Sequence, residues 1–335
     1  MKRKDFSKLS IKTQTEKNSY FEHEDFIAGT APFLRGIDTT MFIQKNLTTQ
    51  LLIDFSIPKK CNNFLKEHIF TGYKNCVFHF NTSTNPEALG IIANTKEDFK
   101  ILLQEIPLND IEITLSANED IISILKLFFA AAHELGFDEK NLKISVVLNQ
   151  KQQSTFIDDF LIYIDKNLSN FKSITILPSK TSKDYNPETE LAYFLLECFS
   201  FITTLISKGF KIDEIAPKLA LTIELGKNPV VEISKMRAVR ILWSKMLLQF
   251  QPKNIKSSAL KIHLNSNFSS HIKVLNAVFG GAQSVISSKA VFQIINEETN
   301  ITRTVDPWAG STSIEKKTEE IILNSWELFL QLQKK

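Results

Sequence analysis

The sequence has few cysteines and no long apolar run, and both absences narrow the classes of protein to which it can belong. Its three cysteines, Cys61, Cys76 and Cys198, are odd in number and far apart along the chain. This spacing forms neither a disulfide framework nor a zinc knuckle, so we expect reduced, mostly buried thiols and no metal site. Residues 1–26 lack the apolar core of a signal peptide, and no stretch approaches the roughly 18 apolar residues of a membrane span. These absences indicate a soluble, cytoplasmic protein with no membrane partner.

The sequence also lacks a strong charge of either sign. Its formal net charge is +3, and its lysines are scattered among acidic residues without a basic block. No nucleic-acid partner is expected, because proteins that bind nucleic acid concentrate lysine and arginine on one face. What the chain does have is 43% hydrophobic residues over 335 positions, enough to bury one large core.

Short β-branched and aromatic runs alternate with segments of helical periodicity along most of the chain. Eight runs have the composition of strands, at residues 76–80, 90–93, 111–115, 143–148, 173–177, 219–225, 259–264 and 282–287. Helical periodicity lies between them, at residues 95–105, 118–135, 153–167, 187–208 and 229–250. Thr95 followed three residues later by Asp98 predicts a capping box at the start of the first of these helices. This alternation predicts an α/β fold with a parallel sheet, and eight strands in succession predict a closed (β/α)₈ TIM barrel. An open doubly wound sheet is the alternative, but no G-x-G-x-x-G motif follows any run.

The two ends of the chain differ from the predicted barrel. Residues 1–28 are polar with isolated aromatic side chains, so we expect an extended N-terminal arm that lies on a partner subunit. Residues 29–335 form the predicted barrel domain, and residues 315–333 are predicted to add a C-terminal amphipathic helix to it.

The residues that follow the predicted strands are polar but carry few titratable groups, although a barrel enzyme holds its active site there. Only Lys180 and Glu224 are charged. Lys180 could form a Schiff base or lie exposed in a loop, and Glu224 could act as a base or pair with a neighbour. His79 and His263 fall within predicted strands, which favours a hydrogen-bonded structural role over metal ligation. So sparse a site suits a subunit or scaffold better than an independent enzyme.

Three segments carry a family resemblance. Residues 31–36 read APFLRG and precede Thr40 and Met41, residues 232–243 read EISKMRAVRILW, and Glu298 precedes residues 301–311, ITRTVDPWAGS. In this order they resemble the PFxRG…TM, E-x-AKLRAxRxLW and E…TR-x-V/I-DPW-x-GS segments of the methylmalonyl-CoA mutase family. The resemblance runs over residues 25–320 and implies the TIM barrel of an adenosylcobalamin-dependent isomerase that acts on CoA thioesters.

Several positions depart from the catalytic chains of that family. Asp38 and Leu52 stand where the resemblance places two tyrosines, and Ser179 and Lys180 stand at its Tyr-His pair. Arginines of the family correspond here to Lys45, Gln50 and Lys261. Lysine in place of arginine loses bidentate geometry, and leucine in place of tyrosine removes both a hydroxyl and an aromatic wall. No catalytic residue is therefore expected in this chain.

Some family positions are retained. Thr40, Met41, Thr48, Gln283 and Glu298 match positions near the substrate or cofactor, so the resemblance makes them the candidates for residual binding.

The resemblance also bears on cofactor and partner. The sequence contains no D-x-H-x-x-G motif, whose histidine is the lower cobalt ligand in the family, and we expect no cobalamin-binding domain after the barrel. The resemblance thus implies a small, non-catalytic subunit that binds no cofactor itself. Its implied partner is the large catalytic subunit of a heterodimer, which holds adenosylcobalamin and interconverts (R)-methylmalonyl-CoA and succinyl-CoA. Two alternatives stay open: a pseudoenzyme that binds CoA thioesters without turning them over, and an independent barrel enzyme that uses Lys180.

Overall fold

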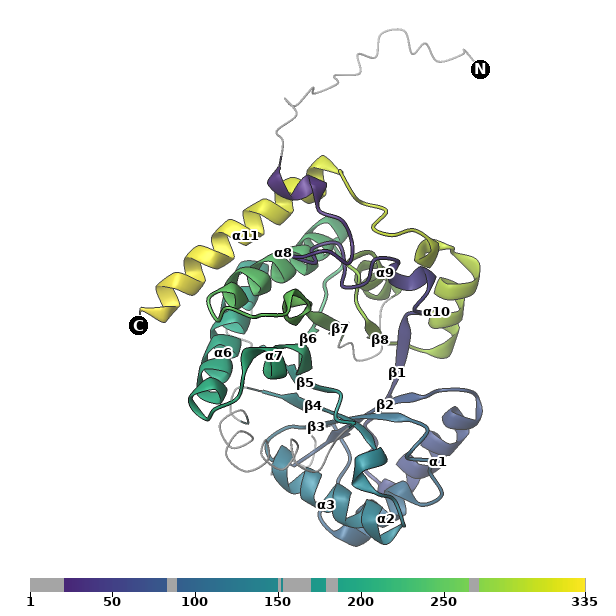
Figure 1. Cartoon of the computed structure of the whole chain (residues 1–335). Coiled ribbons are helices and arrows are strands. Elements are labelled where there is room, and N and C mark those ends of the chain that lie inside the picture. The colour runs from purple at the N-terminus through teal and green to yellow at the C-terminus, as the bar shows by residue number, and fades with distance from the viewer. Residues whose placement is uncertain are drawn as a thin grey trace, which may run out of the picture.

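Eight parallel strands close into a barrel in which each strand pairs with the next along the chain and β8 pairs with β1 (Figure 1). The computed structural model describes residues 21–82, 89–149, 152, 170–178, 186–264 and 271–334. The strands are β1 Thr48–Ile53, β2 Asn75–Phe80, β3 Glu112–Ala117, β4 Lys143–Leu148, β5 Ser173–Ile176, β6 Leu219–Ile223, β7 Lys261–Leu264 and β8 Ser284–Ile286. The prediction of a (β/α)₈ barrel is confirmed.

Seven of the eight predicted runs are strands, and the run at 90–93 is wrong. Its Ile91 makes only an isolated bridge to Phe80, because Gly90 adopts a left-handed φ of 133° that breaks the extended backbone. The missing strand is β1, which the sequence did not reveal. Its residues alternate between half-exposed and buried, so polar Thr48 and Gln50 interrupt what would otherwise read as an apolar run.

Helices cover the outside of the barrel. Those within the described residues are α1 Pro58–Phe70, α2 Lys96–Leu103, α3 Ile121–Glu134, α6 Pro187–Ser207, α7 Ile212–Ile215, α8 Pro229–Leu248, α9 His271–Phe279, α10 Lys289–Gln293 and α11 Thr312–Gln333. The predicted capping box at α2 is confirmed, because Thr95 Oγ1 accepts from the Asp98 N–H at 3.2 Å and Asp98 Oδ2 accepts from the Thr95 N–H at 3.0 Å. The helix predicted at 153–167 lies outside the described residues.

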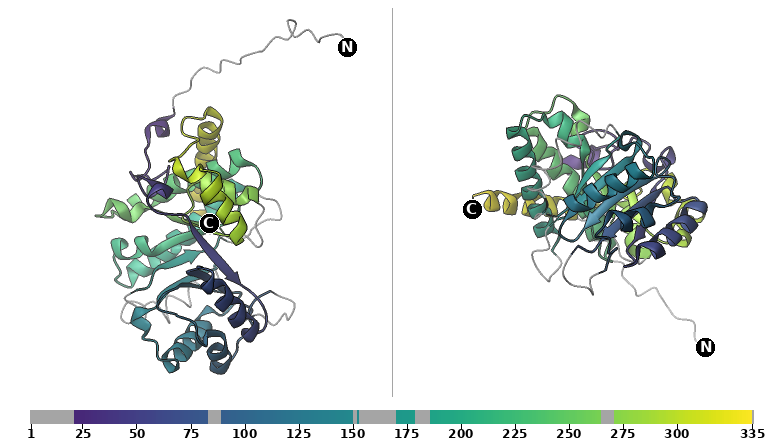
Figure 2. Two further views of the ribbon diagram at one scale, coloured as in Figure 1. Left: turned by 90° about the vertical axis from the view of Figure 1, so that its right-hand side faces the viewer. Right: turned by 90° about the horizontal axis from the view of Figure 1, so that it is seen from below.

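The C-terminal helix α11 packs along α6 and α8 and runs in the same direction as both (Figures 1 and 2). Near its start, Lys317 Nζ lies 3.6 Å from a carboxylate oxygen of Glu188 in α6. Near its end, the ring of Phe329 lies 6.3 Å from that of Phe199, and Lys245 of α8 sits over Trp326. This packing confirms the predicted C-terminal helix.

One helix corrects the expectation about apolar runs. By length and composition α6 could cross a membrane, although half of its most apolar window is buried inside the molecule. Because its apolar side chains Leu191, Phe194, Leu195 and Phe201 are buried, they are accounted for by the core.

A buried network of charges joins three distant parts of the chain. Arg35, from the segment before β1, lies 2.7 Å from Asp306 and 3.3 Å from Glu315. Arg237 of α8 pairs with both of these carboxylates, and His23 Nε2 lies 3.1 Å from Glu315 Oε2. Arg35, Arg237 and Asp306 come one each from the three segments that carry the family resemblance. The network therefore fixes residues 23–35 and the start of α11 to the barrel.

Candidate functional site

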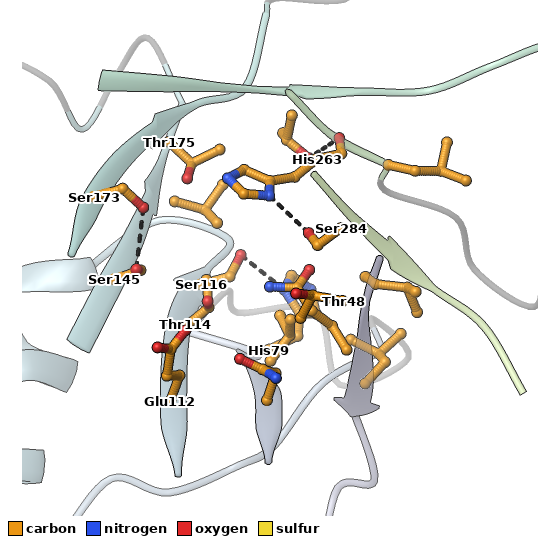
Figure 3. Close-up of a pocket in the computed structure, with 18 of the residues that line it drawn as sticks. Thr48, His79, Glu112, Thr114, Ser116, Ser145, Ser173, Thr175, His263 and Ser284 are labelled. Atoms are coloured by element: carbon orange, nitrogen blue, oxygen red, sulfur yellow. Dashed lines mark hydrogen bonds between the residues drawn. The ribbon is translucent and has the colours of Figure 1, made fainter. Parts of the chain in front are cut away.

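The interior of the barrel is hollow. A cavity of about 410 Å³ runs between the strands and is lined by inward-facing side chains from all eight of them (Figure 3). The lining includes eight small hydroxyl side chains, which are Thr48, Thr114, Ser116, Ser145, Ser173, Thr175, Thr222 and Ser284. TIM barrels usually fill this space with bulky branched side chains. Here serine and threonine leave the space open, and we call it the lumen.

The strands produce this lumen by ordinary alternation. In β3, Ile113, Leu115 and Ala117 are buried beneath the surrounding helices, while Thr114 and Ser116 point into the lumen. Ser173 donates to Ser145 Oγ across neighbouring strands at 3.0 Å (Figure 3). The alternation of residues along the strands therefore places these hydroxyl groups on the inner face of the barrel.

Two histidines face the lumen and are each held by a serine of the next strand. His79 Nδ1 lies 3.2 Å from Ser116 Oγ, and His263 Nδ1 lies 2.6 Å from Ser284 Oγ (Figure 3). Burial lowers the pKa of both rings, to about 4 for His263. For His79, the negative charge of Asp54 opposes this lowering. Both rings are therefore neutral at pH 7. The predicted hydrogen-bonded role of these histidines is confirmed, but their rings line the lumen.

Charged side chains gather where the strands begin, at the N-terminal mouth of the lumen. Lys172, Lys261 and Glu112 line it. Burial lowers the pKa of Lys261, and the positive charge of Lys172 lowers it further. Asp38, the first of the departures from the family, lies 2.5 Å from Lys45 in an ion pair near this mouth.

The structure brings only some of the predicted site residues together. Thr48, Leu52 and Gln283 line the lumen. The Gln283 amide is committed to the backbone, since its oxygen accepts from Ile262 N–H at 2.7 Å and its nitrogen donates to the Gly281 carbonyl at 2.9 Å. Of these three, Thr48 and Leu52 therefore remain free to meet a ligand.

The other predicted residues lie elsewhere. Met41 is buried outside the lumen against Gly36 and Gly281, and Thr40 donates to the side chain of Gln44. Glu298 is exposed in a π-helical turn, η6 Ile294–Glu298. These three residues do not line the lumen, and their part in ligand binding stays a prediction. Ser179 and Lys180 lie outside the described residues.

The state of the three thiols agrees with the sequence. Cys61, Cys76 and Cys198 are free and buried, and burial raises the pKa of the first two to about 12. Across the described ranges, no group of three or more His, Cys, Asp or Glu side chains could hold a metal ion.

Sequence reasoning missed most of the lumen lining. The signal that could have revealed it is the regular placement of serine and threonine inside strand runs, as in KISVVL at 143–148 and SITIL at 173–177. Read as alternation, these residues mark an inner face that is polar instead of apolar.

Comparison with known proteins identifies the family. The model of the methylmalonyl-CoA mutase family matches residues 4–289 and 278–335. The chain is 26% identical over 370 residues to the methylmalonyl-CoA mutase of Cereibacter sphaeroides, covering 93% of this chain and 52% of that protein. It is 25% identical to the large subunit from Porphyromonas gingivalis, with the same coverage, and 28% identical to the human mitochondrial enzyme, covering 93% of this chain and 50% of that one. The chain spans about half the length of these relatives. The barrel, its collinear motifs and the family match lead to one conclusion, that this chain belongs to the methylmalonyl-CoA mutase family.

Proposed function

We propose that this chain is the small, catalytically inactive subunit of an adenosylcobalamin-dependent methylmalonyl-CoA mutase in the cytoplasm. Its role is to stabilise a large catalytic subunit that interconverts methylmalonyl-CoA and succinyl-CoA. The observation that carries the proposal is the lining of the lumen at Leu52, where an aliphatic side chain stands at a family tyrosine.

The chemistry of the lumen supports an inactive site. Among its described lining residues there is no tyrosine and no arginine, and both histidines are neutral and held by serines. Asp38, at the other family tyrosine, is paired with Lys45. Such a lining offers a substrate radical neither an aromatic wall nor a bidentate cation.

The described residues do not fit adenosylcobalamin. A lumen of about 410 Å³ lies in the range of pockets for small organic ligands, roughly 300–1,000 Å³. The strand histidines, which could serve as cobalt ligands, are hydrogen-bonded inside it. We therefore assign the cofactor to the partner subunit.

The experiment is co-expression with a large mutase subunit, followed by size-exclusion chromatography and cobalamin absorbance. A stable complex should form, and its cobalamin should equal one per large subunit. The small subunit alone should give no cobalamin spectrum after mixing with adenosylcobalamin. Stoichiometric binding by the isolated chain would contradict the proposal.

A second candidate function is a pseudoenzyme that binds CoA thioesters. The observation that favours it is the open polar lumen with Lys172 and Lys261 at one mouth, since a long polar chain with anionic phosphates matches that shape and charge. Isothermal titration of the chain with a CoA thioester tests it, and no measurable heat at millimolar ligand would reject it.

A further inference from the structure

Lys261 is a half-buried lysine without a close acidic partner. It begins β7 and points into the lumen at its N-terminal mouth. Among the described residues, no carboxylate forms an ion pair with its Nζ. Lysine is rarely buried without such a partner, because the ammonium group loses its hydration. The positive charge of Lys261 is therefore poorly compensated.

A second lysine stands beside it at the same mouth. Lys172 directly precedes β5, and its backbone N–H donates to the Ile144 carbonyl at 2.8 Å, which fixes its position next to β4. Its side chain lines the lumen while the residue stays exposed to solvent. Burial and then the charge of Lys172 lower the pKa of Lys261. At a given pH, a larger share of this amine is unprotonated than that of an exposed lysine.

The acidic side chains at the mouth oppose this effect only from a distance. Glu112 and Asp38 act on Lys261 in the opposite direction to Lys172. Asp38, however, lies 2.5 Å from Lys45, so much of its charge is answered there. Lys172 thus keeps its ammonium group for an anion that enters from solvent.

Uncharged polar side chains line the lumen around Lys261. His263 follows two residues later on the same inner face of β7 and is neutral at pH 7. Thr222 and Ser284 flank His263 on the neighbouring strands. The lumen of about 410 Å³ admits a small organic molecule. Such a molecule, entering at the N-terminal mouth, meets one amine, one ammonium group and several hydroxyl groups.

This amine lies far along the barrel from the position where family chemistry is lost. Lys261 begins its strand, whereas Leu52, at a family tyrosine, lies near the C-terminal end of β1. Barrel enzymes hold their active sites at the C-terminal ends of the strands. A reactive group at the opposite mouth is therefore a separate site.

We propose that Lys261 forms an imine with a small aldehyde or ketone that carries an anionic group, and that Lys172 binds this anionic group. The unprotonated Nζ adds to the carbonyl carbon. Both of its hydrogens pass to the carbonyl oxygen, which leaves as water while the C=N bond forms. The reaction is a reversible condensation that uses no oxidant and no further reactant.

The test exposes the full chain to pyridoxal 5′-phosphate at pH 7, a probe with both an aldehyde and a phosphate. Borohydride then reduces the imine to a stable amine, and peptide mass spectrometry locates it. The reference within the same molecule is Lys316, an exposed lysine of α11 outside the lumen. We expect Lys261 to be modified at least about five-fold more than Lys316. Equal modification of the two lysines would overturn the proposal.

Replacement of Lys172 separates protonation from binding. With pyridoxal, which lacks the phosphate, Lys172→Met should slow modification of Lys261 at pH 7 and move its pH profile to higher pH, because the neighbouring cation is gone. With pyridoxal 5′-phosphate the loss should be larger, about ten-fold, since the phosphate also loses its partner. Lys316→Met is the matched control and should leave both rates at Lys261 unchanged.

Identical rates at Lys261 in Lys172→Met and in the unchanged protein would overturn the part assigned to Lys172. Lys261→Arg keeps the positive charge but cannot form the imine, so its modified peptide should disappear while the melting temperature stays the same. None of these results bears on the proposed subunit role, which is tested separately by complex formation.

Discussion

Glu315 is the residue on which the buried charge network converges. Its carboxylate is fully buried, and burial alone would raise its pKa; a hydrogen bond from His23 and the charges of Arg237 and Arg35 instead hold the pKa at about 2, against a usual 4.5. A carboxylate with a depressed pKa stabilises the fold above pH 4.5, and that stabilisation disappears as the pH falls toward 2.

Replacement of Glu315 by glutamine should therefore lower the free energy of unfolding at pH 7 by about 3 kcal/mol, because Arg35 and Arg237 lose a shared partner. The difference between the variant and the unchanged protein should shrink between pH 4.5 and 2. Urea unfolding across that range measures it, with exposed Glu327→Gln as the control. A difference that does not change with pH would refute this assignment.

Gly90 is a second residue with a specific physical role. Its φ is 133°, and a Cβ added there would lie 2.7 Å from the backbone nitrogen of Asn81. Gly136 has a φ of 88° but open space around it, so the two positions separate backbone strain from steric overlap.

We expect Gly136→Ala to cost about 1 kcal/mol from the left-handed conformation alone, and Gly90→Ala to cost about 3 kcal/mol or more. Chemical denaturation of both variants gives the comparison. Equal costs would show that the close approach of Gly90 to Asn81 contributes nothing.

Among the elements, α11 shows how a helix outside the eight-fold pattern becomes part of the core. Phe329 is 2% exposed between Phe199 and Trp326, whereas the next residue, Leu330, is 41% exposed.

Phe329→Ala should destabilise the protein by about 3–5 kcal/mol, and Leu330→Ala by less than about 1 kcal/mol. Thermal unfolding of the pair tests whether α11 is packed or only adjacent; similar midpoints would mean that it is not packed.

The strands show why element prediction failed at one place. In β1 the inward residues are Thr48, Gln50 and Leu52, and the outward ones are buried under helices. An α/β barrel strand usually reads as a continuous apolar run, since both of its faces are buried. A lumen lined by polar side chains breaks that rule. As a result, β1 lacks a continuous apolar run, whereas residues 90–93 form such a run but are not a strand.

At the scale of the whole molecule, the N-terminal arm is the proposed contact with the large subunit. The network places His23 on Glu315, so the first described residues lie beside the start of α11 (Figure 1). Deletion of residues 1–20 keeps His23, whereas deletion of residues 1–25 removes it.

If the arm binds the partner, deletion of residues 1–20 should weaken co-purification with the large subunit without lowering the melting temperature of the isolated chain. Deletion of residues 1–25 should weaken co-purification and also lower the melting temperature, since Glu315 then loses its His23 contact. Unchanged complex formation after either deletion would exclude the arm as an interface.

The sequence by itself determined the alternation of strands and helices, the capping box at Thr95, the buried free thiols and the family, because each depends on local periodicity or on short motifs. Tertiary structure alone decided that the barrel closes through β1 and β8, that its interior is hollow, and that Arg35 meets Asp306 across 271 positions of the chain. Local patterns indicate which face of an element is apolar. They do not indicate which other element packs against that face, since contacts between distant segments are fixed only when the elements pack together.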